Sequence, residues 1–316
     1  MTKILTNKEA AEFLLERDNF AILTHRRPDG DTIGSSAALC RILRKAGKTA
    51  HIIRNSEITD RFAWLHEGLT KDAAEENDII ITVDVASPGM LPKDFECYVN
   101  RVTLRIDHHG AATSFTELEL VDSGAAACAE IIYDLLECMW VEMDADIADA
   151  IYVGTSTDTG CFRFANTTSH TFITAASCAA HGARVYQLNQ QLFETNTLGR
   201  LKIQGWIVEN MKVFSDGKLA VIAIPKAVEE SIGATDDDMD NISSFPRTVA
   251  GVCMAATLRE NKDGEVKLSV RAIPGYDATL IAGRFGGGGH KGAAGASIKM
   301  NLTDAAAAVE KAMLEL

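Results

Sequence analysis

Imidazole and carboxylate side chains gather at a few points of this 316-residue sequence, and their types favour metal chemistry. The residues that stand out are His25, Asp29, Asp31, Asp84, Asp107, His108, His109 and Asp158. No cysteine lies beside them in the sequence. Imidazole nitrogen and carboxylate oxygen, without a thiolate, are typical ligands of hard or borderline divalent ions such as Mn²⁺ or Mg²⁺. A structural zinc site is disfavoured.

The elements around these residues predict that they meet. Residues 19–25, 79–84 and 102–107 are apolar, β-branched runs that end in one of the polar groups, and Asp158 follows a predicted helix over residues 144–157. An open α/β sheet places its ligand site at the carboxyl ends of its strands. The small residues Gly34, Ser35 and Ser36, early in a predicted helix over residues 32–46, are expected to let its first turn approach a ligand closely.

The number of carboxylates indicates two ions rather than one. Held together without cations, the carboxylates would repel one another or shift their pKa values upward. A pair of ions ~3.5–4 Å apart is the usual device for activating water in phosphoryl chemistry. In the spacing His25-x-x-x-Asp29-x-Asp31, the first two residues can face one ion and the third can face the other. Asp84, alone at its strand end, is the natural bridging ligand.

Each of these residues also has an ordinary structural interpretation. A lone aspartate such as Asp84 or Asp158 is often a helix cap or a turn residue, and adjacent histidines occur by chance. The joint occurrence of the groups, in this order and each at the end of a predicted element, favours the metal site. Arg163, which closely follows Asp158, is a candidate contact for the substrate.

A glycine run near the C-terminus predicts a second kind of site. The run Gly286-Gly287-Gly288-Gly289 leads into His290 and Lys291. Such runs are commonly flexible linkers. This one lies between a predicted helix (278–284) and a predicted strand (296–299), so we interpret it as a loop whose amides surround an anion. Arg271, at a predicted strand end, is either a second cationic contact or a surface residue.

Alternating strands and helices predict an α/β protein with two domains. Residues 1–194 are expected to form a mostly parallel sheet covered on both faces, with further strands at 49–54 and 118–121. Residues 195–211 are expected to form a helical connector, and residues 212–316 a smaller α/β domain. The other predicted helices are 6–17, 125–139, 169–181, 185–193 and 303–316, and the other predicted strands are 219–225, 249–259 and 265–272.

Composition excludes several functional classes. The formal net charge of −13 argues against binding of long nucleic acid, which needs a basic surface. Seven isolated cysteines contain no Cys-x-x-Cys pair, so neither a zinc ribbon nor a redox motif is indicated. The chain has no signal-like N-terminus and no charge-free run of the ~18 residues that a membrane helix needs. We therefore expect a cytoplasmic protein that does not bind membranes.

The remaining histidines have no carboxylate partner nearby in the sequence and are interpreted as structural. They are His51, His66, His170 and His181.

The ordered motifs resemble those of a known family. The chain is similar to the DHH phosphoesterases, and within them to the oligoribonuclease/pAp-phosphatase (nanoRNase) type with its DHH-associated C-terminal domain. The resemblance extends over nearly the whole length and rests on His25-x-x-x-Asp29-Gly30-Asp31, Val83-Asp84, Asp107-His108-His109, Thr157-Asp158-Thr159-Gly160 and Gly286-Gly287-Gly288-Gly289-His290. Lys291 departs from the expected pattern, because an uncharged residue is more usual at that position.

The resemblance implies a role for each residue of the motifs. One Mn²⁺ would be held by His25, Asp29 and Asp84, and a second by Asp31, Asp84, His108 and Asp158; Mg²⁺ or another divalent ion is an alternative. Asp107 would orient a histidine. His109 would contact the scissile phosphate or protonate the leaving oxygen. In the C-terminal domain, the implied substrate contacts are Arg271, Gly287, Gly288, Gly289 and His290, which would place the active site in the cleft between the domains.

The resemblance implies a hydrolase that cuts short RNA oligonucleotides to mononucleotides and also removes the 3′-phosphate of pAp. A phosphodiesterase for the dinucleotide pApA or for cyclic di-AMP is the alternative with the same motifs. A manganese pyrophosphatase would lack the glycine–histidine segment, and a RecJ-type exonuclease would be longer. An alternative from another class is a nucleotide sensor without activity. The sequence leaves open whether the protein is a homodimer.

Overall fold

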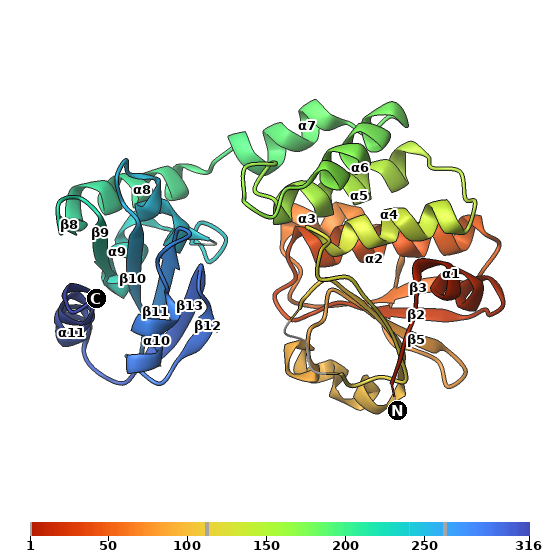
Figure 1. Cartoon of the computed structure of the whole chain (residues 1–316), viewed down its shortest axis with the longest axis horizontal. Coiled ribbons are helices and arrows are strands. Elements are labelled where there is room, and N and C mark those ends of the chain that lie inside the picture. The colour runs from red at the N-terminus through yellow and green to blue at the C-terminus, as the bar shows by residue number, and fades with distance from the viewer. Residues whose placement is uncertain (1, 111–113, 240, 262–263) are drawn as a thin grey trace. The chain divides into compact units, whose positions relative to one another are not determined.

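The computed structural model describes residues 2–110, 114–239, 241–261 and 264–316 (Figure 1). The chain divides into two compact units, Met1–Thr195 and Asn196–Leu316. Each unit has its own sheet and its own apolar core.

The first unit is built on a seven-stranded sheet in which every pairing is parallel, as the sequence predicts. Its strands are β1 (Lys3–Ile4), β2 (Phe20–Leu23), β3 (Ala50–Ile53), β4 (Thr70–Lys71), β5 (Ile79–Val83), β6 (Val102–Asp107) and β7 (Leu118–Val121). The spatial order is β1-β7-β6-β5-β2-β3-β4. From β2 the chain continues to β3 on one side, and it returns to β5 on the other. The order therefore reverses between β2 and β5, where an open α/β sheet binds ligands.

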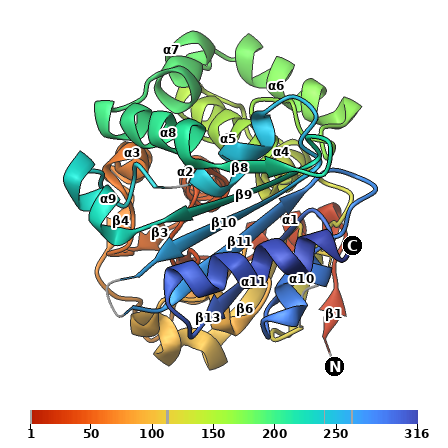
Figure 2. The ribbon, with the colours of Figure 1, turned by 90° about the vertical axis from the view of Figure 1, so that its left-hand side faces the viewer.

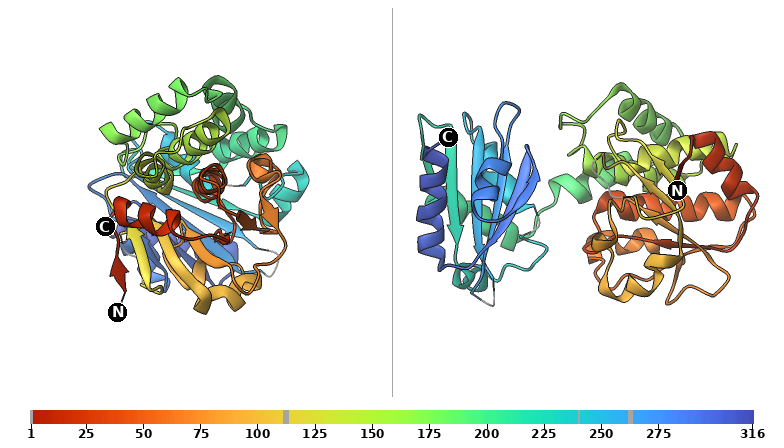
Figure 3. Two further views of the ribbon diagram at one scale, coloured as in Figure 1. Left: turned by 90° about the vertical axis from the view of Figure 1, so that its right-hand side faces the viewer. Right: turned by 60° about the horizontal axis from the view of Figure 1, so that its bottom comes forward.

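The two faces of this sheet are covered differently (Figures 1 and 3). The α-helices lie over one face, where Ile22 of β2 joins the large core. They are α1 (Asn7–Leu15), α2 (Gly30–Lys45), α4 (Cys128–Cys138), α5 (Ala145–Asp158), α6 (Ser169–Ala180) and α7 (Val185–Asn189). The alternate residues of β2, Ala21 and Leu23, face a smaller core that includes Leu91 and Phe95. That core lies beneath two 3-10 helices, Pro88–Met90 and Lys93–Arg101, which the sequence did not predict.

Helices α2 and α5 pack closely because glycines line their contact. A Cβ atom on Gly34 of α2 would lie 2.4 Å from the carbonyl oxygen of Ala150 in α5. A Cβ atom on Gly154 of α5 would lie 2.5 Å from the Cβ of Ala129 in α4. Distances this short are excluded for real side chains, so glycine is required at both positions. The close approach expected at Gly34 is therefore made to a helix and not to a ligand.

Short segments complete the first unit. They are α3 (Asp60–Ala63), a 3-10 turn at Trp64–His66 and a π-helical turn at Gln190–Glu194. Side chains cap the N-termini of two helices. Thr6 and Glu9 form a capping box at α1, and Asp29 caps α2 by accepting from the amides of Asp31 and Thr32. The cap fixes where α2 begins, and with it the position of Asp31.

The second unit is a six-stranded mixed sheet. Its strands are β8 (Lys212–Phe214), β9 (Leu219–Ile224), β10 (Met254–Glu260), β11 (Val266–Ala272), β12 (Gly288–His290) and β13 (Ala293–Ile298). The order is β12-β13-β11-β10-β9-β8, and only β9 and β10 pair in parallel among these strands. The predicted strand over 249–259 starts later, at Met254, because a 3-10 helix (Ile242–Thr248) and a short turn precede it.

Helices cover both faces of the second sheet. Helices α10 (Thr279–Arg284) and α11 (Leu302–Leu314) lie over one face (Figure 2), where Val270 and Ala294 join the core. Helix α8 (Leu198–Asn210), predicted as a connector, packs through Ile203 and Ile207 on the other face. Helix α9 (Lys226–Ile232) follows β9. The second unit therefore has a complete core of its own.

Two further expectations concern the whole chain. All seven cysteines are free thiols, in keeping with their isolated positions. In the part of the chain that the structure describes, no helix combines the length and the apolar character needed to cross a membrane.

Candidate metal centre

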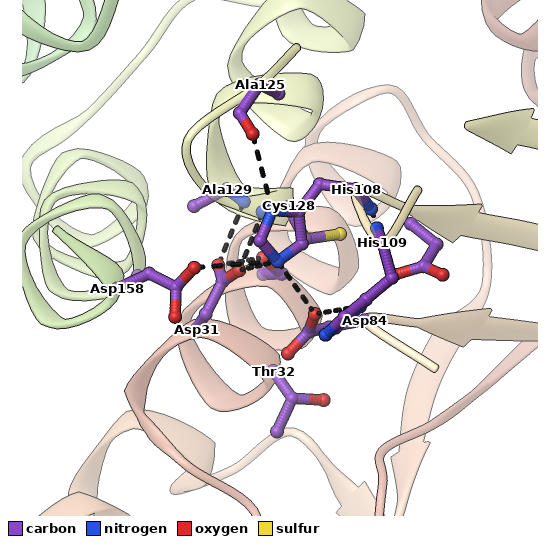
Figure 4. A network of polar contacts seen from close by, with 12 residues as sticks. Asp31, Thr32, Asp84, His108, His109, Ala125, Cys128, Ala129 and Asp158 are labelled. Atoms are coloured by element: carbon purple, nitrogen blue, oxygen red, sulfur yellow. Dashed lines mark hydrogen bonds and ion pairs between the residues drawn. The ribbon is translucent and has the colours of Figure 1, made fainter. Parts of the chain in front are cut away.

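The predicted ligands come together where the sheet order reverses, between the carboxyl ends of β2, β5 and β6 (Figure 4). Helix α2 contributes Asp31 from its first turn, and α5 contributes Asp158 as its last residue. Among the described residues, three overlapping groups have ligand atoms within 4.8 Å of one another: His25, Asp29 and Asp84; Asp31, His108 and Asp158; and Asp84, His108 and His109. The structure therefore joins residues from five different elements into one cluster.

The first group contains one imidazole whose tautomer is fixed. The Nδ1 of His25 lies 2.8 Å from the carbonyl oxygen of Arg26, and a carbonyl can only accept, so Nδ1 carries the proton. The Nε2 atom is left facing Oδ1 of Asp29 and Oδ2 of Asp84, each at 3.5 Å. Asp29 also caps α2, so the backbone holds its carboxylate in place. These three side chains present one nitrogen and two oxygens to a common point.

The second group repeats this arrangement with other partners. The Nδ1 of His108 faces the carbonyl oxygen of Ala125 at 3.3 Å. Its Nε2 faces Oδ2 of Asp158 at 3.5 Å and Oδ2 of Asp31 at 3.8 Å. Figure 4 shows Asp31 at the start of α4, where its carboxylate accepts from the amides of Cys128 (2.6 Å) and Ala129 (3.0 Å). A helix N-terminus stabilises a negative charge, so the start of α4 favours the ionised form of Asp31 and opposes the effect of its burial.

Asp84 lies between the two groups. Its Oδ2 is 3.5 Å from Nε2 of His25, and its Oδ1 is 3.5 Å from Nε2 of His108. Oδ1 is buried and has no hydrogen-bond partner. The residue has φ = +58°, which an aspartate tolerates better than most residues. A left-handed backbone at a non-glycine residue is strained, and strain of this kind is retained at functional sites. The unpaired Oδ1 points to the same conclusion.

The imidazoles are strongly polarised by the carboxylates. Burial lowers the pKa of His25, but Asp29 and Asp84 outweigh it and raise the pKa to about 11. Burial likewise lowers the pKa of His108, and Asp84 with Asp31 raises it to about 10. Burial raises the pKa of Asp84, and the two imidazoles together bring it down to about 2. Asp84 is therefore the carboxylate that stays ionised.

Two other carboxylates of the cluster, the buried Asp31 and the half-buried Asp158, experience the opposite effect. Burial, with the nearby charge of Asp84, raises the pKa of Asp31 well above its usual value. Burial raises the pKa of Asp158 to about 7, and Asp84 and Asp29 add to the rise. Several carboxylates in one buried cluster need cations beside them to remain ionised. The nitrogen and oxygen donors, the unused Oδ1 of Asp84 and this surplus of negative charge fit two divalent ions.

His109 differs from the other two histidines of the cluster. Its Nδ1 donates to Oδ1 of Asp107 at 2.7 Å, and the same oxygen accepts from the amides of His108 and His109. The hydrogen bond to Asp107 is the main reason why the pKa of His109 is raised. The His109 side chain is 36% exposed, more than His25 or His108. Asp107 therefore sets the orientation of a ring that can meet a ligand from solvent.

Two predicted substrate residues lie in one line across the second sheet. His290 of β12 pairs with Ala293 of β13, which pairs with Arg271 of β11. Directly paired residues project from the same face of a sheet. Val270 and Ala294, the adjacent residues, join the core beneath α10 and α11, so Arg271 and His290 project from the opposite face. The small side chain of Ala293 between them leaves room for a ligand group.

The glycine segment is not the open loop that the sequence predicts. The amides of Gly286 and Gly287 donate to carbonyls of α10 and are used in ending that helix. Gly288 and Gly289 belong to β12, paired with β13. A Cβ atom on Gly287 would lie 2.1 Å from the carbonyl oxygen of Gly295, and Gly289 has φ = +145°. The glycines are therefore needed for a tight hairpin that presents His290, and two of the four amides are not available to an anion.

Arg163, the predicted contact for the substrate, lies in the turn that follows α5. Its side chain is exposed, and its Nε donates to the carbonyl oxygen of Gly160 at 2.6 Å. The turn that carries it contains three consecutive residues with positive φ, Gly160, Cys161 and Phe162. This tight turn directly follows Asp158 and ends α5 abruptly.

Two of the remaining histidines have carboxylate partners that lie far away in the sequence. Nε2 of His51 lies 3.3 Å from Oδ2 of Asp78, and Nε2 of His170 lies 3.1 Å from Oδ1 of Asp134. The sequence does not show these pairs, because only tertiary contact creates them. His66 contacts the hydroxyl of Ser36 at 2.8 Å.

Several residues around the cluster hold the predicted ligands without belonging to the three groups. Ser35 donates to Oδ1 of Asp31 at 3.0 Å, a contact that the spacing of four residues on one helix could have indicated. Asn55 and Asn166 donate to the backbone carbonyl oxygens of His25 and Asp158, respectively. The contacts of the two asparagines are made to backbone atoms, so residue type and spacing do not reveal them.

Comparison with known proteins agrees with this geometry. Residues 19–155 match the model of the DHH family N-terminal domain, and residues 216–315 match that of the DHHA1 domain. A bifunctional oligoribonuclease and PAP phosphatase, NrnA, of Thermus thermophilus is 34% identical over 88% of this chain and 83% of its own. The chain belongs to the DHH family. The predicted family, fold class and class of enzyme, a phosphoesterase, are confirmed.

Two further relatives bear on the fold and on the alternatives. The cyclic-di-AMP phosphodiesterase GdpP of Geobacillus thermodenitrificans is 26% identical over 88% of this chain but only 44% of its own. Among solved structures, an exopolyphosphatase-related protein from Bacteroides fragilis superposes with a TM-score of 0.89 at 23% identity, covering 100% of this chain and 98% of that one. This last likeness shows the fold alone.

Proposed function

We propose that this protein is a two-metal phosphoesterase that hydrolyses short oligoribonucleotides to mononucleotides and removes the 3′-phosphate of pAp. The observation that carries the proposal is the position of Asp84, whose two carboxylate oxygens face one imidazole each, His25 and His108. A carboxylate shared in this way is suited to bridging two ions. Substrates of this kind are named for the NrnA relative, which is similar over most of both chains.

In this proposal, one ion is held by His25, Asp29 and Asp84. The second is held by Asp31, Asp84, His108 and Asp158. Two such ions supply Lewis-acid charge and a water made nucleophilic near neutral pH. Mn²⁺ suits the mixture of imidazole and carboxylate donors, and Mg²⁺ is the alternative because the donors include three carboxylates around the second ion.

In this proposal, His109 donates a proton to the leaving oxygen, and Asp107 orients His109. Asp107 holds the Nδ1 proton of His109, which leaves Nε2 to meet the phosphate or the leaving oxygen. Because the pKa of His109 is raised, the ring is charged over more of the neutral range and can donate a proton from Nε2. The leaving oxygen then departs as a hydroxyl and not as an alkoxide.

The second unit handles the substrate in this proposal. Arg271 and His290 project from one sheet face on either side of Ala293, and in this proposal they contact a substrate phosphate and its sugar or base. The glycines Gly287, Gly288 and Gly289 shape the hairpin that carries His290 and add no side chains of their own. Arg163, exposed in the turn that follows Asp158, is proposed as a further contact for a substrate phosphate. The net charge of −13 disfavours long polyanions.

A turnover panel with Mn²⁺ tests the proposal. The substrates are pApA, a mixed dinucleotide, a five-nucleotide RNA, a twenty-four-nucleotide RNA, pAp, cyclic di-AMP and pyrophosphate. We expect release of mononucleotide from the short oligomers and of phosphate from pAp, with little product from the long RNA. Preference for the long RNA, or activity on pyrophosphate alone, would contradict the proposal.

A second candidate function is hydrolysis of cyclic di-AMP or of pApA. The similarity to GdpP over 88% of this chain favours it. Activity confined to these di-adenylates, with none on other dinucleotides, would select this function. Tight binding of nucleotides without any turnover would instead favour a sensor that has kept the fold.

A further inference from the structure

We propose that Asn55 and Asn166 are positioning residues, each of which fixes the backbone of one metal group. The inference rests on the two-metal function proposed above and goes beyond it, because neither asparagine is a ligand. Each side-chain amide donates to the carbonyl oxygen of a ligand residue, His25 for Asn55 and Asp158 for Asn166. The two asparagines come from different segments and serve different groups.

Asn166 ties two segments together beside the second group. Its Nδ2 donates to the carbonyl oxygen of Asp158 at 3.2 Å and to that of Ala126 at 3.0 Å. An amide nitrogen has two protons, so one side chain satisfies both acceptors. The end of α5, where Asp158 lies, is thereby attached to the segment that leads into α4.

The segment 125–129 in turn holds the other two ligands of the second group. The carbonyl oxygen of Ala125 accepts from His108, and the amides of Cys128 and Ala129 donate to Asp31. With Asn166 in place, all three ligands of the group formed by Asp31, His108 and Asp158 are connected to these five residues. Asn166 thus completes a single backbone support for the second ion.

The same segment is itself anchored. The amide of Ala126 donates to Oε2 of Glu130, a side chain that is 1% exposed. Glu130 thus binds the amide of Ala126, and Asn166 binds its carbonyl oxygen. The peptide planes on both sides of Ala126 are fixed by these two contacts. The support is therefore rigid at the point where Asn166 joins it.

Asn55 has the corresponding place beside the first group. Its Nδ2 donates to the carbonyl oxygen of His25 at 2.9 Å and to the hydroxyl of Thr24 at 3.0 Å. The side chain is buried at the carboxyl end of β3, next to β2 in the sheet. Its Oδ1 accepts from the amide of Glu57 and so fixes the orientation of the amide group. Asn55 therefore sets the turn that aims His25 at the first ion.

Metal titration of single and double variants tests the inference. Free Mn²⁺ is followed by its EPR signal as Mn²⁺ is added to the full-length protein, and we expect two bound ions for the unaltered chain. Asn166→Ala should lower the affinity for one ion by about tenfold or more, since contacts that support ligands have effects of about 10–100-fold. Asn55→Ala should do the same for the other ion.

Ligand variants identify which ion is affected. In the Asp158→Ala background the second group is already impaired, so Asn166→Ala should change the affinity for the remaining first ion less than twofold. In the Asp29→Ala background the remaining ion is the second one, and Asn166→Ala should reduce its affinity about tenfold. Asn55→Ala should show the reverse pattern. Asn210→Ala is the matched control, because that amide also donates to a backbone carbonyl but lies in α8.

Two further measurements distinguish an effect on folding from an effect on the position of the metal ligands. Asn166 is exposed, so Asn166→Ala should leave the thermal unfolding of the metal-free protein nearly unchanged, and a higher Mn²⁺ concentration should restore turnover. Asn55→Asp, which keeps the shape but loses the donor, replaces Asn55→Ala if the latter fails to fold.

Two results would overturn the inference while the two-metal function stands: equal loss at both ions, or no loss at either, in a protein whose unaltered form binds two. Binding of fewer than two ions by the unaltered chain would instead refute the proposed function itself.

Discussion

The candidate metal centre of the first unit and the sheet face of the second unit that carries Arg271 and His290 differ in how firmly their side chains are held. Every imidazole of the centre has one nitrogen fixed by a backbone carbonyl or a carboxylate, and Asp31 accepts from two amides at a helix start. In the second unit, His290 is exposed, and Arg271 donates to the carbonyl of the adjacent Val270. The side chains of the first unit are therefore fixed before any ligand binds, whereas those of the second unit are positioned mainly by the register of the sheet.

The roles proposed for the two regions account for this difference. Charges that develop in a transition state are stabilised best by groups already in place, because no reorganisation is then needed. Contacts to parts of a substrate that do not react can adjust as the substrate binds. We therefore expect substitutions in the first region to act on metal binding and kcat, and substitutions in the second to act mainly on KM.

Asp84→Asn should have the largest effect. Asparagine tolerates the left-handed backbone of this position, so the variant removes the charge without the strain that alanine would add. Because Asp84 faces both metal groups, we expect kcat to fall by about 10³-fold or more and both ions to bind more weakly. Turnover assays and Mn²⁺ titration check this. Near-normal rates with Mn²⁺ would refute the bridging role.

Metal affinity should depend steeply on pH. Raised pKa values of about 11 for His25 and about 10 for His108 mean that both rings are protonated near neutral pH without metal. Each ring must lose a proton to bind an ion, so affinity increases as pH rises toward these values and decreases as pH falls. Between pH 8 and 9 we expect about a 10²-fold change for the two ions together.

Calorimetry in two buffers of different ionisation enthalpy measures the released protons directly. Affinity that does not change with pH would show that these imidazoles are not ligands.

Asp107→Asn should reduce kcat by about 10²-fold, because His109 would lose its orientation and its raised pKa. If His109 donates the proton to the leaving group, kcat falls as pH rises through its pKa. Lowering that pKa moves this fall to lower pH. The pH profile of kcat is the measurement, with metal content as the control. An unchanged profile would assign His109 to binding alone.

His290→Ala and Arg271→Ala should have the smallest effects on chemistry. We expect KM for short oligonucleotides to rise about tenfold, which is the usual size for loss of one charge-assisted contact, with both ions still bound. Steady-state kinetics on pApA and metal analysis check this. Loss of metal from either variant would contradict the division between the two regions.

Much of the fold could be read from local sequence patterns. The apolar runs that became β2, β5 and β6 and the periodic segments that became α2 and α5 are correct to within a few residues. Segments with weak or mixed patterns were not predicted, including the edge strands β1 and β4 and the 3-10 helices over residues 88–101. These segments are specified by the surface they pack on, and their own periodicity is too short to show it.

For the candidate metal centre, the sequence by itself determined the types of the candidate ligands, their order along the chain and their places at the ends of elements. The tertiary structure decided how each ligand is held. Asp31 accepts from the amide of Cys128, 97 residues away, and Asn166 reaches back to Ala126. The tertiary structure also shows that the predicted glycine loop is a hairpin. Backbone amides and carbonyls are the same at every residue, so contacts made through them leave no mark on residue type and exist only once the chain has folded.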